Sequence, residues 1–486
     1  MRKHVKAGLP ACLFLLLFYI GKAQSVALPP AQQAFQLILD LRTDEARRLI
    51  EKMPPPRSIY LASLADMLEM FVREDPGLFS GYENNFEKRL DELSRLNVPS
   101  AEKMYTLAEL RLQWAFINLK FGNELQAAWQ LRQSYLAAQS CRQKYPHYEP
   151  IRKTWGVLNL TLGSVPEKYQ WVLRMLNLNG SVETGLRELN RTSRASDNYG
   201  TEALILLSLA QSYLLQQNEM ALANMETLIK THPQQAVYFM AAAIALKSSQ
   251  GKKALAYVDS LLSKPPLQIP YTWYIRGEAL LSAGRYEEAA TAYQQFIQSY
   301  PGENFVKDAW YKTGVCYALM NDNQQAETCF FRARSAGDKR TEADRYADSQ
   351  LSESPWPHPV ISRLRFATDG GYYAEALSIV QQHASDSFPS GKDSVEFIYR
   401  TARLFHQLNQ TDTCLYLYKK TIERAGYKPW YFAPNACLQT GYILQQRGQL
   451  REAEMYFRKA LSYPRHPYKN SIDSKAKSAL TQLTTK

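Results

Sequence analysis

The side chains that most often carry chemistry are few in this chain and are scattered along it. Seven histidines and six cysteines occur among 486 residues. No two histidines lie three to five positions apart, and no two cysteines form a C-x-x-C pair. A zinc site on a helix or a thioredoxin-type redox site needs such spacings. The sequence therefore predicts neither a metal site nor a redox site.

Motifs for bound cofactors and activated nucleophiles are also missing. The sequence has no G-x-x-x-x-G-K phosphate loop, no G-x-S-x-G nucleophile elbow and no H-E-x-x-H zinc motif. We therefore expect no cofactor. Cys316 and Cys329 are the one close pair that a disulfide within a helical hairpin would join. The alternative is that the cysteines are small buried hydrophobic residues, as free cysteines usually are.

Acidic residues offer the remaining chemistry, because two carboxylates across one pocket, roughly 5 to 10 Å apart, can hydrolyse glycans. The acidic residues Glu287, Glu288 and Glu452 each begin a predicted helix. A carboxylate there stabilises the helix dipole, so we interpret them as structural. The sequence does not reveal which carboxylates come close together in space. A secreted glycan-active enzyme, or a cell-wall-binding protein, is therefore kept as the alternative to a protein-binding scaffold.

The positive charge is concentrated at the C-terminal end. Residues 419–486 carry 13 Lys and Arg against 4 Asp and Glu, whereas the whole chain has a formal net charge of +12. Either this end is an ordinary solvated helical surface or it meets an anionic partner or surface. Nucleic acid is not expected, because the N-terminus indicates export.

That N-terminus is typical of a cleaved secretory signal. Basic residues precede an apolar run over residues 11–20, and Gly21, Lys22 and Ala23 then provide a cleavage site before Gln24. The run is shorter than the ~20 apolar residues that a membrane-spanning helix needs. We therefore expect a signal peptide over 1–23, no transmembrane segment in the mature chain, and a periplasmic or outer-membrane-associated protein.

The elements that would position any functional residue come from an internal repeat. One copy runs from Trp273 to Pro301 and is followed by others at intervals of 37 to 39 residues. Within a copy, small residues at a helix crossing let two antiparallel helices approach closely, and we expect Gly277 and Ala289 to face each other there. The series of positions that keep this spacing is Trp273, Gly277, Ala289 and Tyr293; Trp310, Gly314, Ala326 and Phe330; and Gly441, Ala453 and Phe457.

The rest of the chain follows this repeat less closely. Residues 57–200 contain long helical patterns whose cores lack the small-residue crossing, and residues 337–359 are charged and then rich in Ser and Pro. We predict these parts in chain order: a degenerate helical region over 24–200, a repeat block over 201–336, an irregular linker over 337–359, a second block over 360–464, and a capping helix over 465–486.

On these residues the chain resembles the tetratricopeptide repeat (TPR) superfamily, and with its signal it resembles exported TPR proteins of Gram-negative bacteria of the Bacteroidota type. The resemblance implies an all-α fold, a right-handed superhelical solenoid of antiparallel helical hairpins. It also implies a concave side that binds a protein or peptide partner. The sequence thus favours a non-catalytic scaffold in the periplasm or cell envelope, with no enzyme activity.

The resemblance also implies which side chains face the groove, because family members place them on the first helix of each repeat. These positions carry Tyr271, Tyr274, Glu278, Tyr311, Tyr399, Arg403 and Tyr442. The tyrosines either contact a partner or pack against the neighbouring helix. The basic and asparagine residues with which chaperone-binding members hold a C-terminal carboxylate are missing at the fifth and ninth places of the repeat, so a client of that kind is not expected.

Overall fold

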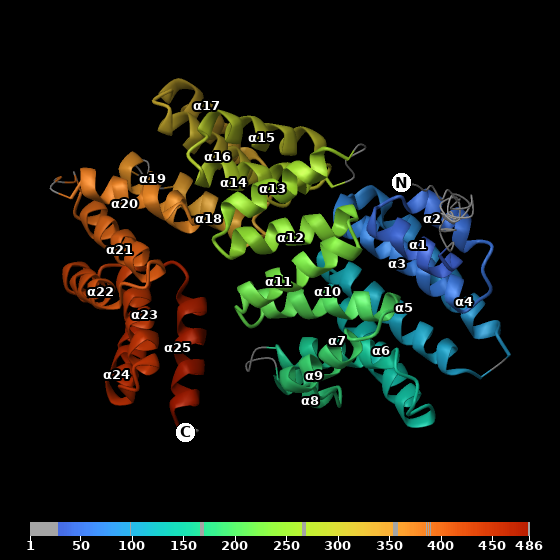
Figure 1. Ribbon diagram of the computed structural model, residues 1–486. Coiled ribbons are helices and arrows are strands. Elements are labelled where there is room, and N and C mark those ends of the chain that lie inside the picture. The colour runs from blue at the N-terminus through green and yellow to red at the C-terminus, as the bar shows by residue number, and fades with distance from the viewer. Residues whose placement is uncertain are drawn as a thin grey trace, which may run out of the picture.

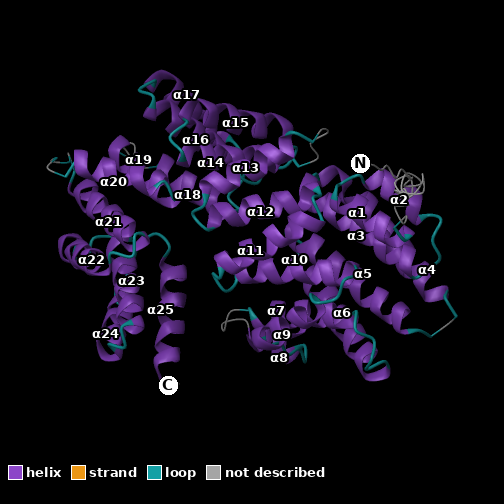
Figure 2. Ribbon diagram, in the orientation of Figure 1, coloured by secondary structure: helices purple, strands orange, loops and turns teal. Residues whose placement is uncertain are grey.

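The structure is a computed structural model in which residues 28–97, 99–165, 170–264, 269–352, 358–384, 386, 388 and 390–484 are described. All regular elements in these residues are helical (Figures 1 and 2), which confirms the predicted all-α class. Consecutive helices form antiparallel hairpins that stack side by side. No helix among the described residues has the length and apolar character needed to cross a membrane. The predicted signal peptide over 1–23 lies outside the described residues.

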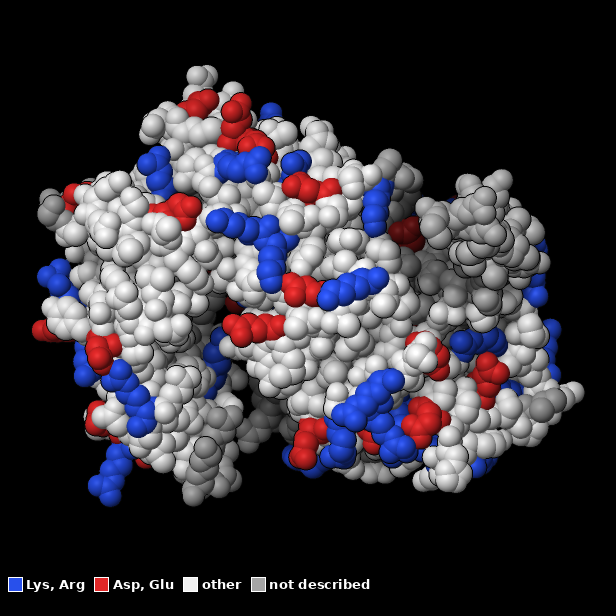
Figure 3. Space-filling model, in the orientation of Figure 1, with Lys and Arg blue, Asp and Glu red and all other residues white. Residues whose placement is uncertain are grey.

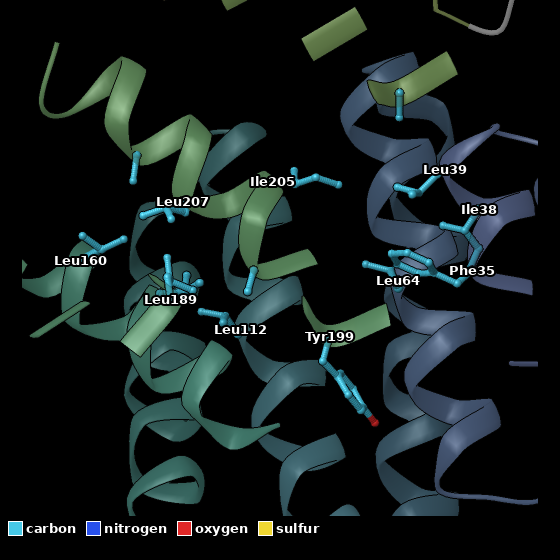
Figure 4. Packing of buried hydrophobic residues seen from close by; sticks show 14 of the residues in the cluster. Phe35, Ile38, Leu39, Leu64, Leu112, Leu160, Leu189, Tyr199, Ile205 and Leu207 are labelled. Atoms are coloured by element: carbon cyan, nitrogen blue, oxygen red, sulfur yellow. The ribbon is translucent and has the colours of Figure 1, made fainter. Parts of the chain in front are cut away.

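The N-terminal region is built from hairpins of uneven length, and their buried side chains merge into one core (Figure 4), where Phe35 and Ile38 lie beside Leu64. The longest pair is α5 and α6, where the Ser134 hydroxyl donates a 2.7 Å hydrogen bond to the Ala108 carbonyl oxygen and both residues are buried. The elements are α1 (Pro30–Leu39), α2 (Thr43–Ile50), α3 (Arg57–Arg73), η1 (Pro76–Leu78), α4 (Phe79–Arg95), α5 (Ala101–Lys120), α6 (Glu124–Lys144), α7 (Ile151–Gly163), α8 (Gln170–Met175), α9 (Val182–Thr192) and α10 (Asn198–Tyr213).

One hairpin of this region differs from the prediction. Helices α7 and α9 cross at Gly156 and Gly185, where an added Cβ on Gly185 would lie 2.8 Å from the Gly156 carbonyl oxygen. Any side chain at either position would clash with the other backbone. The small-residue crossing predicted to be missing from residues 57–200 is therefore present between these two helices. Helix α8 separates them in sequence and hides the pattern.

A buried polar cluster around Lys153 connects several helices of the N-terminal region. Lys153 Nζ lies 3.1 Å from Glu109 Oε2 and also binds Glu202, and Thr154 donates a 2.5 Å hydrogen bond to Glu109. Tyr60 donates to Glu202, and all of these residues are buried. Buried charges need such partners because desolvation is costly. The cluster is closed to solvent, so it is structural.

The central repeats begin with α11 and show close helix crossings at the predicted glycines. A Cβ on Gly277 would lie 2.6 Å from the Tyr293 ring, and a Cβ on Gly314 would lie 2.6 Å from the Phe330 ring and 3.1 Å from the Ala326 carbonyl oxygen. The aromatic ring of the second helix thus fills the space beside each glycine. The helices are α11 (Asn218–Thr231), α12 (Gln235–Lys247), α13 (Gly251–Leu262), α14 (Tyr271–Ser282), α15 (Tyr286–Ser299), α16 (Val306–Leu319) and α17 (Asn323–Ser335).

The predicted irregular linker over 337–359 contains a helix, α18 (Glu342–Leu351). Thr341 begins it by accepting a hydrogen bond from the backbone N–H of Asp344, an N-cap that the sequence analysis overlooked. The Asp344 carboxylate in turn accepts from the backbone N–H of Phe305 and Asp308. Helix α18 has no hairpin partner and packs on α16 and α17. Residues 353–357 of the predicted linker lie outside the described residues.

The second block repeats the hairpin pattern and ends in a single helix. A Cβ on Gly441 would lie 2.5 Å from the Phe457 ring, as at Gly277. The last helix buries Ile472, Ala476 and Ala479 against the preceding hairpin. The helices are α19 (Pro359–Asp369), α20 (Tyr373–Gln382), α21 (Gly391–Gln407), α22 (Thr411–Ala425), α23 (Phe432–Gln446), α24 (Leu450–Leu461) and α25 (Lys469–Thr484).

Contacts between distant repeats curl the array. The backbone N–H of Gly251 donates a 2.9 Å hydrogen bond to the Gly370 carbonyl, which joins the α12–α13 turn to the α19–α20 turn. At the other end, Tyr300 and Asn304 donate 2.7 Å hydrogen bonds to Glu74 at the end of α3. The first contact ties the C-terminal limb (α19–α25) to the central helices, and the second ties the α15–α16 turn to the N-terminal region. Figure 3 shows the surface hollowed between the limb and the part of the molecule around α9 and α11.

Candidate partner-binding site

Three of the predicted groove tyrosines are buried inside the array. Tyr274 and Tyr311 are 5% exposed and Tyr399 is 1% exposed. Tyr274 packs on Phe296 and Phe305, Tyr311 packs on Phe330, and Tyr399 packs on Phe432. The prediction that these rings line an open groove is therefore corrected. Their rings fill the space between neighbouring helices and stabilise the stack.

Tyr274 and Glu278 belong to a polar cluster that closes around the buried Asp308, while Glu278 keeps 27% of its side chain exposed. We call it the sealed cluster (Tyr274, Glu278, Tyr293, Asp308 and Lys312). Tyr274 donates a 2.5 Å hydrogen bond to Asp308. Lys312 Nζ lies 2.6 Å from Glu278 Oε1 and 2.8 Å from Asp308 Oδ2. Tyr293 donates a 2.5 Å hydrogen bond to Glu278. Burial lowers the pKa of Lys312, but Asp308 and Glu278 raise it by more, so the lysine stays charged.

Tyr271 and Tyr442 are half-buried and lie at the edges of the core. The Tyr271 ring stacks on Tyr274 with ring centroids 4.9 Å apart. The Tyr442 ring packs edge-on against Phe457, and its hydroxyl lies 3.5 Å from the Lys475 carbonyl oxygen. Both rings keep part of their surface exposed, so they are accessible to a partner. The two rings do not line a common pocket among those described.

Arg403, the remaining predicted residue, belongs to a second cluster that is rich in arginine. Its guanidinium lies 3.0 Å from Asp369 at the end of α19. On the preceding turn, Arg400 Nη2 lies 2.7 Å from Glu396 and donates a 2.5 Å hydrogen bond to the Tyr431 hydroxyl. Arg365 of α19 donates to the Tyr346 hydroxyl and lies 3.8 Å from Asp369.

The charges of this cluster do not cancel. Three guanidinium groups share the carboxylates of Asp369 and Glu396. Burial raises the pKa of Asp369, but Arg403, Arg400 and Arg365 lower it by more, so this carboxylate is ionised. Even with both acids ionised, the cluster has one positive charge in excess. It therefore presents an electrostatic site for an anion.

A pocket of about 60 Å³ opens beside Arg365. Its walls come from five separate stretches of chain, namely α18, α19, the start of α21, the turn before α23 and the turn before α25. We call it the arginine–tyrosine pocket. The lining residues used below are Tyr346, Arg365, Glu396, Trp430, Tyr431 and Tyr468.

Sequence reasoning found only Arg403 of the arginine-rich cluster. Arg365 precedes Arg403 by 38 residues, which matches the spacing of the weaker repeat copies, so the repeat register was the signal that could have found it. Tyr346 could not be found in this way, because residues 337–359 were predicted to be irregular.

Lys247, the last residue of α12, lies over the Tyr213 ring at 4.0 Å. Burial and the charge of Lys475 on α25 both lower the pKa of Lys247. In the described residues no three His, Cys, Asp or Glu side chains gather as a metal ion would require.

The structure distinguishes between the two alternatives for the cysteines, a disulfide or small buried residues. Cys316 and Cys329 are both buried and are not bonded to each other, and the other described cysteines are also buried and free. Burial raises the pKa of the Cys414 thiol, so this group is not an activated nucleophile. The structure thus agrees with the interpretation of the cysteines as small hydrophobic residues.

Comparison with known families agrees with the repeat pattern. One tetratricopeptide repeat model matches residues 239–304 and 274–339, and a second matches residues 434–466. The chain contains tetratricopeptide repeats. The matched residues lie in the central repeats and in the α23–α24 hairpin, whereas the arginine-rich cluster lies between these TPR segments. No curated protein matches the sequence.

Solved structures of helical-repeat proteins are similar over most of their length but at low identity. The apo form of the quorum sensor NprR from B. thuringiensis is 12% identical and has a TM-score of 0.30, with 89% of this chain and 97% of that chain covered. Yeast Tom70 is 14% identical, with a TM-score of 0.28 and coverage of 93% and 97%. A Rap protein complexed with competence and sporulation factor is 11% identical, with a TM-score of 0.24 and coverage of 93% and 98%. These matches are too distant to assign a partner to this TPR-containing chain.

Proposed function

We propose that the protein is a non-catalytic TPR scaffold that binds a protein or peptide partner in the hollow between its central helices and its C-terminal limb. The observation that carries the proposal is the arginine–tyrosine pocket. Arg365 lines it together with the aromatic side chains of Tyr346, Trp430, Tyr431 and Tyr468, and Arg400 and Arg403 lie in the arginine-rich cluster behind it. Arginine and tyrosine are the residue types enriched where proteins bind partners.

An enzymatic role has less support. Hydrolysis of a glycosidic bond needs two carboxylates across one pocket. The arginine–tyrosine pocket is lined by a single carboxylate, Glu396, and that group is paired with Arg400. A paired, ionised carboxylate is a poor proton donor. We therefore place the protein among binding scaffolds rather than glycan-active enzymes.

The proposal includes an exported location, in the periplasm or at the outer membrane. Its support is the basic N-terminus followed by the apolar run over residues 11–20 and the small residues before Gln24. Mass spectrometry of the protein from its native cells tests this part. A mature N-terminus at Gln24 is expected, and a chain that retains Met1 would refute the proposed cleavage.

Site-specific photo-crosslinking in native cells tests the binding function. A benzoylphenylalanine replaces Trp430 at the pocket, and in a matched control it replaces Phe331, which is 71% exposed on α17. The proposal predicts a discrete crosslinked protein at position 430 that is missing at position 331. If neither position, nor a third at Tyr442, yields a crosslink above background, the hollow is not a partner-binding site.

A further inference from the structure

The second helices of the C-terminal limb carry an excess of positive charge. Residues 411–464 contain eight Lys and Arg against four Asp and Glu. None of these charges lies on α23, so all of them lie on α22, on α24 and on the adjoining turns. The two central hairpins, α14–α17, carry six basic and seven acidic residues over 271–335. The hairpin fold by itself therefore does not require the positive excess.

Helices α22 and α24 lie side by side and run in the same direction. Near their first residues, Arg447 Nη2 lies 2.7 Å from Asp412 Oδ1. Just beyond their last residues, the rings of Tyr427 and Tyr463 pack with centroids 5.1 Å apart. Contacts at both ends require the two helices to be parallel, and α23 packs against both of them. Figure 1 shows α22 at the outer edge of the limb and α25 on the side of the hollow.

The exposed side chains of these two helices, which we call the outer face, mix basic and large apolar groups. On α22, Tyr416 is 63% exposed, and Lys420 lies over its ring at 5.9 Å. On α24, Met455 is 64% exposed and lies one turn from both Arg451 and Lys459. The exposed basic residues of the outer face and its turns are Lys419, Arg424, Lys428, Arg451, Arg458 and Lys459. Basic side chains are visible along this edge of the limb in Figure 3.

An anionic bilayer surface matches this composition. Lipid phosphates attract Lys and Arg side chains that lie within a Debye length of the membrane. Tyrosine is enriched at the depth of the headgroups, where its ring and its hydroxyl both find suitable surroundings. Apolar side chains beside basic ones are typical of helices that lie in the plane of a membrane surface. A peptide binds best in a groove, whereas two parallel helices present their outer sides along their whole length.

We propose that the outer face of α22 and α24 docks on a membrane surface rich in anionic phospholipid. The basic side chains lie at the lipid phosphates, and Tyr416, Tyr427 and Met455 lie at the boundary between headgroups and acyl chains. The inference goes beyond the proposed function, because it assigns a second surface on the limb and leaves the hollow free for a protein or peptide partner.

The first experiment measures flotation of the mature chain with lipid vesicles. The probe is a vesicle of phosphatidylglycerol and phosphatidylcholine in equal parts, and the comparison is a vesicle of phosphatidylcholine alone. Each basic side chain near an anionic surface strengthens binding by about fivefold, so the anionic vesicles should bind at least about a hundredfold more tightly. Raising the salt from about 0.1 M to about 1 M should release the protein, because the Debye length falls from about 10 Å to about 3 Å. Equal binding to both vesicles, or binding to neither, would overturn the proposal.

Variants of the protein then locate the surface. Lys419→Gln with Arg424→Gln removes two exposed charges from α22 and should weaken binding to the anionic vesicles by about twentyfold. The matched control is Arg187→Gln with Arg191→Gln, which removes two exposed charges from α9. The control should bind within about twofold of the unchanged protein, because the α9 charges lie far from the outer face. Equal losses in the two variants would show attraction to the overall charge and would refute the site.

A fluorescent label tests the apolar contact without removing any charge. The five cysteines of the mature chain are buried, so a thiol-reactive nitrobenzoxadiazole dye should label the added cysteine of Met455→Cys. Its emission should shift to the blue when anionic vesicles are added. The matched control is the same dye on Phe331→Cys, at an exposed position of α17, and its emission should stay unchanged. A blue shift at neither position, or an equal shift at both, would contradict insertion of the outer face.

An acidic protein is the other occupant that the test distinguishes, and polyglutamate is its probe. If Lys419→Gln with Arg424→Gln abolishes binding of polyglutamate while the unchanged protein binds no vesicle, the outer face belongs to an acidic protein and the lipid proposal is refuted. The proposed function is tested separately. A partner that still crosslinks at position 430 in this double variant would leave the role of the hollow intact, whatever the vesicles show.

Discussion

The sealed cluster and the arginine–tyrosine pocket both gather polar side chains from neighbouring helices and turns, but the second also borders an open space of about 60 Å³. In the sealed cluster, Lys312 pairs with the carboxylates of Glu278 and Asp308, and a tyrosine hydroxyl donates to each of them, while Asp308 Oδ1 has no hydrogen-bond partner among the described residues. In the pocket, three arginines share two carboxylates beside a space of about 60 Å³. Polar residues at equivalent places in a repeat array can therefore serve either stability or binding.

The difference between the two clusters arises from helix stacking. Helices α14, α15 and α16 follow one another as regular hairpins, so their side chains close over the sealed cluster. Before the second block, α18 stands without a hairpin partner, and its Tyr346 reaches across to Arg365 and Tyr468. The pocket forms where the regular stacking is interrupted. The break in the repeat, rather than the repeat itself, creates the candidate site.

The largest expected effect is in the sealed cluster. Lys312→Met would leave Glu278 and Asp308 without their cation in a buried place, so the free energy of unfolding should fall by about 3 to 5 kcal/mol. Urea unfolding followed by circular dichroism measures the change. Lys475→Met is the control on an exposed surface and should change stability by less than about 0.5 kcal/mol. Equal effects of the two variants would mean that the cluster is not sealed.

The second prediction concerns the joint that holds the C-terminal limb opposite the central helices. Gly371 has φ +80°, and an added Cβ would lie 1.9 Å from the Ser249 carbonyl oxygen. Gly371→Ala should therefore lower the free energy of unfolding by about 2 to 4 kcal/mol, because backbone strain adds to the clash.

Gly448→Ala is the matched control for this joint, because Gly448 has φ +76° and nothing within 4 Å of an added Cβ. This variant should lower the free energy of unfolding by only about 1 kcal/mol, because only the backbone conformation is strained. Small-angle X-ray scattering should show a larger radius of gyration for Gly371→Ala and an unchanged one for the control. Identical scattering from both variants would show that the joint does not position the limb.

A smaller effect is expected in the pocket. Arg365→Gln removes one of three arginines and leaves Asp369 paired with Arg403. Its side chain is 27% exposed, so the loss of stability should be about 1 kcal/mol. Thermal unfolding measures this change. A loss as large as that of Lys312→Met would show that the pocket arginines are needed for folding and would remove the contrast between the two clusters.

The smallest effect is a pH dependence beside the arginine-rich cluster. His406 lies 3.2 Å from the Tyr418 hydroxyl, and burial followed by the charge of Arg403 lowers its pKa. Since the unfolded chain then binds the proton more readily than the folded chain, stability should fall as pH decreases below about 6.5. Urea midpoints at pH 7.5 and 5.5 should differ less for His406→Gln than for the unchanged protein. An identical pH difference in both proteins would exclude this histidine as the cause.

The sequence was most informative where a geometric constraint recurs. Gly277, Gly314 and Gly441 recur because the aromatic ring of the following helix leaves no room for a side chain, and this regularity revealed the hairpins. The sequence failed where the constraint is local and occurs once. The Thr341 N-cap of α18 and the crossing of Gly156 with Gly185 follow ordinary rules, but a search for repeats does not detect them.

The sequence by itself determined the all-α class, the hairpin repeats and the position of Arg403 on a first helix, because helical periodicity and close helix crossings depend on residues near one another in the chain. Only the tertiary structure decided which polar residues are sealed and which face the hollow. That outcome depends on contacts between distant turns, such as Gly251 with Gly370 and Tyr346 with Arg365. Such contacts depend on the curvature summed over many hairpins, and no short stretch of sequence encodes that sum.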